Sequence, residues 1–498
     1  MAPLIVAAGR TNAAMPSEPR PNNWKQPVVS AQRHRGSRRD AALSPFAELR
    51  RGTSWRFWIL CAFLLLCALG GGSSRAATLS LLYLRPAAVL CIAAAALVPG
   101  PWDFARYRAP LLILAALAAA IALQLVPLPP QWFAALPGHE KFTEASRLAG
   151  ESAGWHSISL APDLTLNSLL ALLPALAVLV VFAGMNEADR DRTLLFLPVL
   201  ALATILFAIL QLAQGPDSPA YLYSITSRSL PVGLFANRNH QAAALAIAIP
   251  AFAGVAVILT RHFSRPAIIF GMCGVLSLLC ILFGLLTGSR SGLALLGVGV
   301  LGTAAVIWPV VTSRRYRLLM VVGLGVALAL AIVLAIAFGR ATSVERLTGE
   351  SNMSGELRLL TLPVLSQLVR DYMPFGSGFG TFDPIFRNAE PMSLLRQSFF
   401  NNAHNDFIEL AITGGVAAVA VLIAAMLWFF HRGWHTARSA GSTSTPVVMA
   451  KLGWLALAMI ALASLSDYPV RTPIFTAVAA LMAAWLCSPV IARESVRA

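Results

Sequence analysis

Charged residues are scarce in this sequence. Of its 498 residues only 12% are Asp, Glu, Lys or Arg, and 57% are hydrophobic. Soluble globular proteins are usually about 25% charged. The shortage excludes an ordinary soluble enzyme and indicates a polytopic membrane protein.

The sequence also lacks the common markers of disulfide, metal and hydrolase chemistry. Its six cysteines all lie in apolar runs, at Cys61, Cys67, Cys91, Cys273, Cys280 and Cys487. They form no disulfide framework and have no metal-ligand spacing. Neither H-E-x-x-H nor G-x-S-x-G occurs. We therefore expect no metal and no cofactor.

Positive charge is abundant by comparison, since the net charge is +16. Ten of the 38 Lys and Arg residues precede Phe57, and many others lie in short turns between apolar runs. Orientation signals of membrane proteins are distributed in this way, so we expect no nucleic-acid partner. Residues 1–54 are predicted to be a disordered basic cytoplasmic tail. Its stretch 33–39 is a candidate contact for anionic lipid headgroups, although a solvated tail is the simpler interpretation.

Long apolar runs occupy most of residues 55–490. A bilayer core of roughly 30 Å needs about 20 apolar residues per helix. The sequence therefore predicts an all-α polytopic membrane fold with about twelve transmembrane helices. The runs are 55–70, 78–98, 109–126, 166–184, 193–213, 239–259, 266–286, 291–310, 318–338, 406–430, 449–466 and 471–488.

Arginines in alternate turns predict the orientation of these helices. One set of turns carries basic pairs, such as Arg190 with Arg192 and Arg261 with Arg265, whereas the other set mostly has one basic residue each. By the positive-inside rule both termini are then cytoplasmic. The longer segments 127–165, 214–238 and 339–405 are then external. The last of these is expected to form the roof of a site.

Several arginines lie on the predicted outer side, at Arg238, Arg290, Arg358 and Arg471. A charge at membrane depth costs about 2.5–3.5 kcal/mol, so each needs a partner. An arginine fork matches phosphate oxygens, which predicts a diphosphate site with Arg290 as its foremost member. The alternative is that each arginine extends to the lipid headgroups or pairs with a loop carboxylate.

His404 directly precedes the predicted helix 406–430. A histidine can accept a proton at neutral pH, and here it is positioned to deprotonate an acceptor hydroxyl. Asn405 or Asp406 is expected to orient its ring. The alternative is a histidine beside a helix cap made by one of these two residues. His240 has the same ambiguity.

Two further motifs invite a functional interpretation and are better explained as structure. The segment PFGSGFGTF, residues 374–382, lacks the strand and the Lys-Ser/Thr ending of a nucleotide-binding loop. Its glycines are predicted to supply positive φ angles and close backbone packing. Asp189 and Asp191 form the sequence's D-x-D motif, in a cytoplasmic turn that is more simply solvated than metal-binding.

Several local motifs together resemble the O-antigen ligase and O-antigen polymerase superfamily of bacterial inner-membrane proteins. In order they are ISLAPDLT (158–165), GLFANRNHQAA (233–243), LTGSRSG (286–292), the stretch from Glu356 to Phe382, NNAHNDFIELAITGG (401–415) and SDYPVRTP (466–473). The resemblance covers about residues 155–475.

The resemblance implies a membrane glycosyltransferase fold of the GT-C type in the inner membrane, acting in cell-surface polysaccharide biosynthesis. The donor would be a glycan on undecaprenyl diphosphate, and the acceptor a hydroxyl of a glycan, lipid or protein at the periplasmic face. Neither metal nor nucleotide would be needed. Matched by motif, Arg290 and Arg238 would bind the diphosphate, His404 would be the base or orient the acceptor, and Arg358 would be the loop arginine.

Two other functions stay open at this point. Outer arginines also suit a transporter of a small or lipid-linked anion, although transporters usually show internal repeats, and none is visible. A glycosyltransferase facing the cytoplasm would instead use Asp189 and Asp191.

Overall fold

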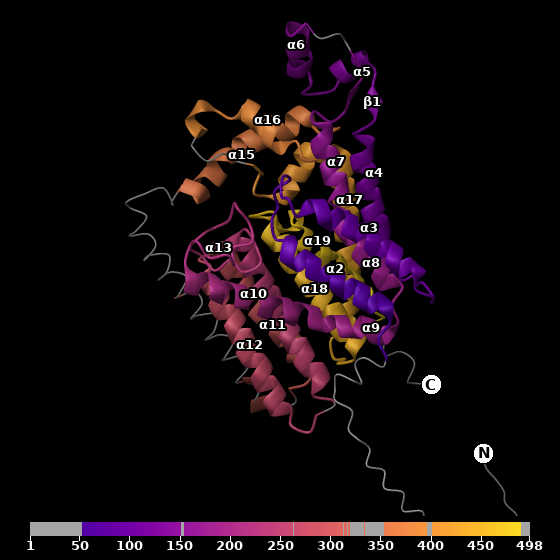
Figure 1. The fold of residues 1–498 in the computed structure, drawn as a ribbon, viewed down its shortest axis with the longest axis vertical. Coiled ribbons are helices and arrows are strands. Elements are labelled where there is room, and N and C mark those ends of the chain that lie inside the picture. The colour runs from indigo at the N-terminus through magenta and orange to yellow at the C-terminus, as the bar shows by residue number, and fades with distance from the viewer. Residues whose placement is uncertain are drawn as a thin grey trace, which may run out of the picture. The chain divides into compact units, whose positions relative to one another are not determined.

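The computed structural model describes residues 52–150, 154–261, 263–311, 353–395 and 401–489, with single positions between 313 and 333. Residues from Gly52 onward form one helical unit (Figure 1). The predicted tail lies almost wholly outside the described residues. So do the predicted helix 318–338, apart from a few positions, and the parts 339–352 and 396–400 of the predicted large loop.

Helices account for nearly all regular structure of the described residues. They are α2 (Trp55–Gly70), α3 (Leu81–Leu97), α4 (Arg108–Leu123), α5 (Pro130–Ala134), α6 (Glu140–Leu148), α7 (Pro162–Leu170), α8 (Leu173–Ala183), α9 (Glu187–Arg192), α10 (Phe196–Gln214), α11 (Arg238–Leu259), α12 (Pro266–Leu286), α13 (Arg290–Ile307), α15 (Met353–Tyr372), α16 (Phe382–Ala389), α17 (Asp406–Arg438), α18 (Thr445–Ser464) and α19 (Pro473–Leu486), with 3-10 turns η1 (Thr193–Leu195), η2 (Met392–Leu394) and η3 (Pro469–Arg471). A two-residue pair, β1 (Pro127–Leu128) and β2 (His156–Ser157), is antiparallel.

The all-α membrane architecture is confirmed. Among the described residues, seven helical spans are long and apolar enough to cross a membrane, and α2, α3, α4 and α19 are shorter apolar helices. Each predicted apolar run other than 318–338 coincides with one of these helices. The total of twelve stays a prediction, as does the GT-C type of fold.

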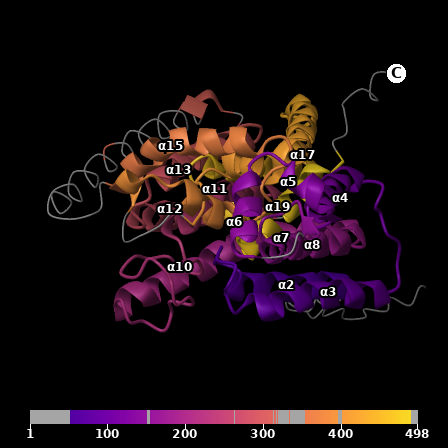
Figure 2. The same ribbon diagram turned by 90° about the horizontal axis from the view of Figure 1, so that it is seen from above.

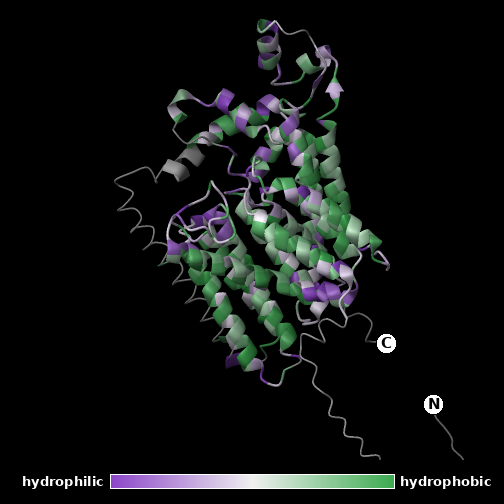
Figure 3. Cartoon of the chain, viewed as in Figure 1, coloured by the Kyte–Doolittle hydropathy of each residue, from purple (hydrophilic) through white to green (hydrophobic). Residues whose placement is uncertain are grey.

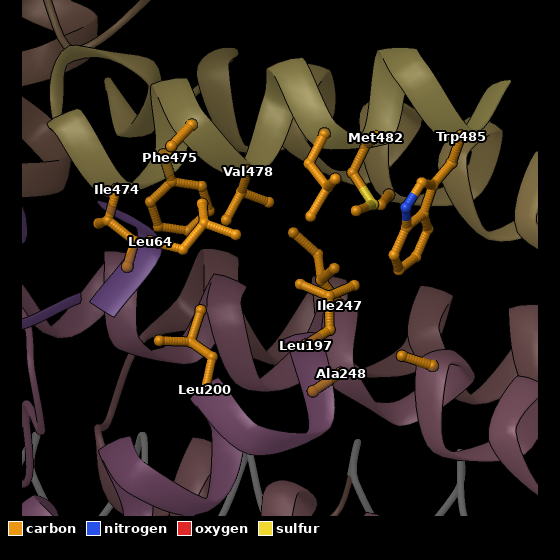
Figure 4. Packing of buried hydrophobic residues seen from close by; sticks show 14 of the residues in the cluster. Leu64, Leu197, Leu200, Ile247, Ala248, Ile474, Phe475, Val478, Met482 and Trp485 are labelled. Atoms are coloured by element: carbon orange, nitrogen blue, oxygen red, sulfur yellow. The ribbon is translucent and has the colours of Figure 1, made fainter. Parts of the chain in front are cut away.

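Helix α11 lies at the centre of the helix bundle. It is far more enclosed than its neighbour α12, with 83% of its apolar window buried against 17%. Close packing depends on small residues, since a Cβ at Gly292 of α13 would lie 2.2 Å from the Ala242 Cβ of α11. Side chains of α19, among them Val478 and Met482, point at Ile247 of α11 (Figure 4).

The basic turns contact one another at one end of the bundle. Arg106 pairs with Glu187 at 2.7 Å, and Arg190 pairs with the same carboxylate at 2.9 Å. The Arg261 guanidinium lies 3.4 Å from the Thr445 hydroxyl at the start of α18. Helix α9 marks this end, opposite α15 and α16 (Figure 1). Polar residues concentrate toward the two ends, and the helices between them are mainly apolar (Figure 3).

The described parts of the three longer segments lie at the opposite end. The Tyr223 hydroxyl accepts a hydrogen bond from the Gly72 N–H at 2.6 Å. Leu160 N–H donates to the Ser377 carbonyl at 2.9 Å, which joins segment 127–165 to the glycine-rich stretch. Seen from above, α5, α6 and α15 overlie the bundle (Figure 2). The alternation of basic turns and long segments therefore corresponds to two opposite ends of the molecule.

Candidate functional site

A polar site lies at the end of the bundle where the longer segments lie. Asp467 is its central residue, called the hub below. It lies in the turn between α18 and η3, and only 2% of its surface is exposed. Its Oδ2 accepts hydrogen bonds from Asn239 Nδ2 at 2.7 Å and Asn237 Nδ2 at 3.2 Å. Asn237 is also the N-cap of α11. These bonds fix the start of α11 against the turn that precedes α19.

The start of α13 is joined to the same hub. Ser289 caps α13 by accepting from Gly292 N–H at 2.9 Å, and its hydroxyl donates to Asn239 Oδ1 at 2.8 Å. Ser is a strongly preferred N-cap because its oxygen satisfies an otherwise unpaired N–H. The N-termini of α11 and α13 are thereby held together.

Arg238 and Arg290 are the first residues of these two helices. The Arg290 side chain is exposed and makes no hydrogen bond or ion pair with the described part of the chain. Arg238 is half-buried, and a Cβ at Gly288 would lie 3.9 Å from its guanidinium, so it lies against the turn that leads to Arg290. Helix N-termini favour anions, and two arginines beside them strengthen that preference. Arg358 belongs to α15, but its side chain lies outside the described part.

His404 faces Asp467 from the loop before α17. Its Nδ1 lies 3.9 Å from Asp467 Oδ1, and its ring centroid is 5.1 Å from that of Tyr468. Its φ is 52°, in the left-handed region that non-glycine residues seldom occupy. Such a conformation costs about 1–3 kcal/mol and persists only where the surroundings impose it. The histidine side chain remains 21% exposed.

The two residues that follow His404 in the sequence, Asn405 and Asp406, each have a partner other than its ring. Asn405 is the N-cap of α17, and its Oδ1 accepts from Phe407 and Ile408 N–H groups at 3.0 and 3.1 Å. Asp406 binds Arg471 at 3.0 Å. Asp467 is a further carboxylate near His404, one that is distant from it in the sequence.

His240 approaches Asp467 from the other side. Its Nε2 is 3.9 Å from Asp467 Oδ2, and only 1% of the residue is exposed. Neither ring nitrogen has a hydrogen-bond partner among the described residues. Because His240 is enclosed and His404 is not, only His404 is placed to meet a substrate.

Arg471 organises a second cluster next to the hub. Its guanidinium pairs with Glu409 at 2.7 Å and Asp406 at 3.0 Å, and donates to Asn402 Oδ1 at 3.1 Å. Glu409 is 1% exposed and also accepts from Ala403 N–H at 2.8 Å. For this arginine the alternative of carboxylate pairing is therefore correct. The cluster fixes the segment 401–409 against η3, and thereby fixes His404.

Tyr468 lies between the two clusters. Burial, aided by the Asp467 carboxylate, raises the pKa of Tyr468 to about 12. Its hydroxyl therefore stays protonated at neutral pH.

The glycine-rich stretch is confirmed as a packing element. Gly376, Gly378 and Gly380 have φ angles of 78°, 112° and 83°. The N–H groups of Ser377 and Gly378 donate to the Ile412 and Thr413 carbonyls at 3.1 and 2.9 Å. Because α17 engages these N–H groups, they are not available to cradle a phosphate.

The expectation that the D-x-D motif lies in a solvated turn is wrong for Asp189. Asp189 is fully buried and accepts from Ser54 N–H at 2.9 Å, and it pairs with Arg192 at 2.5 Å. No group of three His, Cys, Asp or Glu side chains suited to a metal occurs in the part of the chain that the structure describes.

Residues 275–423 match the family model described as O-antigen ligase. The chain carries an O-antigen ligase domain. The resemblance read from the motifs is thereby confirmed, and with it the general function of a membrane enzyme that ligates or polymerises glycans. The match includes Arg290, the glycine-rich stretch and His404, whereas Arg238 and Asp467 lie outside it. No curated protein matches the chain.

Sequence reasoning missed Asp467 and Asn239 as members of the site. Both belong to motifs that carried the resemblance, in SDYPVRTP and GLFANRNHQAA. Asp467 could have been noticed in the sequence, because a carboxylate among apolar runs needs a polar or charged partner. Its partner could not be named, because Asn239 and His404 are both distant in the sequence.

Proposed function

We propose that this protein transfers or polymerises a glycan from an undecaprenyl-diphosphate donor onto an acceptor hydroxyl at the periplasmic face of the inner membrane, as an O-antigen or polysaccharide ligase or polymerase. The transferase domain spans residues 55–490. The observation that carries the proposal is the placement of His404 beside Asp467. The other oxygen of Asp467 accepts from Asn239, next to Arg238, and Asn239 in turn accepts from Ser289, next to Arg290.

The acceptor oxygen forms a new bond to the anomeric carbon of the donor sugar, and the bond from that carbon to the diphosphate oxygen breaks. The proton of the hydroxyl passes to His404. A base of this kind contributes about 10²–10⁴ in rate. Asp467 orients the ring and stabilises the imidazolium that forms.

The diphosphate leaves with the electron pair and gains negative charge as the bond breaks. Arg290, with Arg238 and the two helix N-termini, stabilises that charge. Removal of one comparable electrostatic donor typically costs about 10²–10³ in rate. No step requires a metal or a nucleotide.

The test is transfer by the purified protein in nanodiscs. An undecaprenyl-diphosphate-linked glycan and candidate acceptors are supplied, and both released undecaprenyl diphosphate and product length are measured. We expect His404→Ala and Arg290→Ala to abolish transfer while the protein stays folded. His435→Ala and Arg147→Ala are matched controls, because His435 lies at the far end of α17 and Arg147 pairs on α6 with Glu144.

Three other outcomes would contradict the proposed site or the proposed function. Full activity in both His404→Ala and Arg290→Ala would make the site assignment wrong. Accumulation of a lipid-linked or small anion in vesicles, with no new glycosidic bond, would favour the transporter. Loss of activity in Asp189→Asn with Arg290→Ala unaffected would favour a cytoplasmic transferase.

The proposed orientation places both termini in the cytoplasm. Its support is that the basic turns lie at the end opposite the site. In intact cells, a membrane-impermeant maleimide should label Ser224→Cys and should not label Ser439→Cys. The reverse pattern would invert the protein and exclude a periplasmic reaction.

A further inference from the structure

A small hairpin projects from the end of the bundle that carries the site. It consists of residues 127–150 and 154–157, with β1, α5, α6 and β2. Helices α5 and α6 lie beyond the end of α4, on the side away from α9 (Figure 1). Two tryptophans of the hairpin are largely exposed, Trp132 at 65% and Trp155 at 66%. Large aromatic side chains that are exposed in this way mark contacts with other molecules.

The hairpin has a core of its own, so a loose fold does not explain the exposure of the two indoles. Phe133 is 8% exposed and His139 is fully buried, and their rings meet edge to face with centroids 4.9 Å apart. The two ring nitrogens of His139 lie 3.0 and 2.9 Å from the Pro137 and Ile158 carbonyl oxygens. The backbone that carries the tryptophans is therefore held in place before any ligand binds.

The two tryptophans belong to one patch of the hairpin surface. Trp132 adjoins Phe133 in α5, and Trp155 adjoins His156 of β2. The rings of Phe133 and His156 are in contact, with centroids 4.9 Å apart. His156 is itself exposed, as is Gln131 beside Trp132. Gln131, Trp132, Trp155 and His156, called the aromatic patch below, combine flat apolar faces with groups that donate and accept hydrogen bonds.

The hairpin is tied to the segment that carries His404. Gln124, the C-cap of α4, leads into the hairpin and is only 4% exposed. Its Nε2 donates to the Thr413 carbonyl of α17 at 2.9 Å, and its Oε1 accepts from Phe379 N–H at 3.0 Å. Since His404 lies in the loop before α17, the aromatic patch and the site belong to one connected end of the molecule.

The chemistry of the aromatic patch matches a glycan. A pyranose ring has C–H faces that pack on a flat indole, and hydroxyls at its edge that hydrogen-bond with amides and imidazoles. Helix α6 has two acidic and two basic residues, so it offers anionic lipid headgroups no excess of positive charge. The O-antigen ligase domain of this chain makes a glycan the polymer that it handles.

We propose that the aromatic patch binds the glycan chain at sugar residues distant from the bond that is made, and that it thereby favours long glycans over short ones. The inference deepens the proposed function and rests on it for its kinetic consequence. Binding itself can be measured without any turnover.

The binding test uses the full-length protein in nanodiscs. The probe is the surface polysaccharide of the cells that make the protein, released by mild acid, labelled at its reducing end with a fluorophore and separated into a short and a long fraction. Fluorescence polarisation should show tighter binding of the long fraction. Trp132→Ala and Trp155→Ala should each weaken that binding about threefold to tenfold, as the loss of one aromatic stacking contact does.

Two controls separate stacking from folding. Trp132→Phe keeps an aromatic ring and should retain most of the binding. Trp434→Ala removes an indole of similar exposure, 61%, that lies near Arg438 at the other end of α17, and it should leave binding unchanged. Because Trp132 and Trp155 are largely exposed, their replacement should leave the protein folded.

The kinetic test follows undecaprenyl diphosphate release with short and long glycans. The double variant Trp132→Ala with Trp155→Ala should raise the KM of the long glycan about tenfold or more, since the two single losses multiply. It should change the KM of the short glycan less than about twofold. We expect kcat to stay within about threefold of wild type, because the aromatic patch is distant in the chain from His404 and binds sugars away from the reacting bond.

The outcomes separate the two proposals. Binding of the long fraction that the tryptophan variants weaken, with no turnover by the wild type, supports the aromatic patch and refutes the proposed function. Turnover whose dependence on glycan length is the same in the double variant and the wild type would overturn the inference. Equal binding of the short and long fractions by the wild type would also overturn it.

A membrane contact of the aromatic patch is the remaining alternative. In nanodiscs of brominated phosphatidylcholine, indoles embedded in lipid lose their fluorescence. We expect the quenched fraction to exclude Trp132 and Trp155, so the quenched emission should be the same in the wild type and in the double variant Trp132→Phe with Trp155→Phe. A smaller quenched emission in the double variant would overturn the inference and assign the patch to the lipid surface.

Discussion

Asp467→Asn is the sharpest test of the site, because it keeps the shape of the side chain and removes its charge. The carboxylate is 3.9 Å from the ring nitrogen of His404. Two unit charges at that distance attract by about 4 kcal/mol at an effective dielectric constant of 20. His404 is 21% exposed, and solvent there screens part of the attraction. We take half to two thirds, about 2–3 kcal/mol, as the stabilisation of the imidazolium that the charge provides.

Each 1.4 kcal/mol in the barrier is a factor of ten in rate, so Asp467→Asn should lower kcat about 10²-fold. The donor KM should change little, since Asp467 contacts the base and the helix starts but is not placed on the diphosphate. The assay is release of undecaprenyl diphosphate in nanodiscs under saturating donor. Asp371→Asn on α15 is the control, because this exposed carboxylate accepts from Gln367 one helical turn away, at 2.5 Å.

The double variant with His404→Ala tests whether the pair acts as a unit. If Asp467 acts through His404, the double variant should be no slower than His404→Ala alone, because residues of one catalytic unit are strongly non-additive. Two results would refute the reasoning. One is kcat of Asp467→Asn within threefold of wild type, and the other is a double variant whose loss is the product of the two single losses.

Three other predictions concern the stability of the fold and the D-x-D motif at Asp189. Gly378→Ala should lower the free energy of unfolding by about 1–3 kcal/mol, because φ is 112° and the new Cβ would lie 2.3 Å from Ser159 Oγ. Arg471→Met should cost about 3–5 kcal/mol, because Glu409 loses the cation that compensates its buried charge. Asp189→Asn should lower the melting temperature but leave transfer within threefold of wild type, because its partners are structural.

The first two of these predictions have matched comparisons. Gly441→Ala, where no atom lies within 4 Å of the new Cβ, should leave the melting temperature in detergent unchanged. The double variant Arg471→Met with Glu409→Gln should recover much of the lost stability, since the uncompensated charge is gone. If it melts no higher than Arg471→Met alone, the charge argument for this cluster fails.

Features that depend on local sequence could be predicted from the sequence. Membrane helices follow from apolar length alone, and the positive φ angles of Gly376, Gly378 and Gly380 follow from the clustering of glycines. The alternation of basic turns along the chain predicted that Arg106, Arg190 and Arg261 lie at one end of the helix bundle, as they do. The loop position of His404 could also be predicted, because a polar segment between two apolar runs must lie outside the apolar part of the helix bundle.

Only the tertiary structure decided which side chains meet. Asp467 faces His404, Arg471 pairs with Glu409, and Asn239 joins Ser289 to the same hub. Asn405 and Asp406 were the expected partners of His404 because they adjoin it in sequence, but one caps α17 and the other binds Arg471. The physical reason is that membrane helices are apolar on most faces. Their composition specifies that they span the membrane, whereas close packing of small residues, as at Gly292 on Ala242, decides which helix starts are brought together.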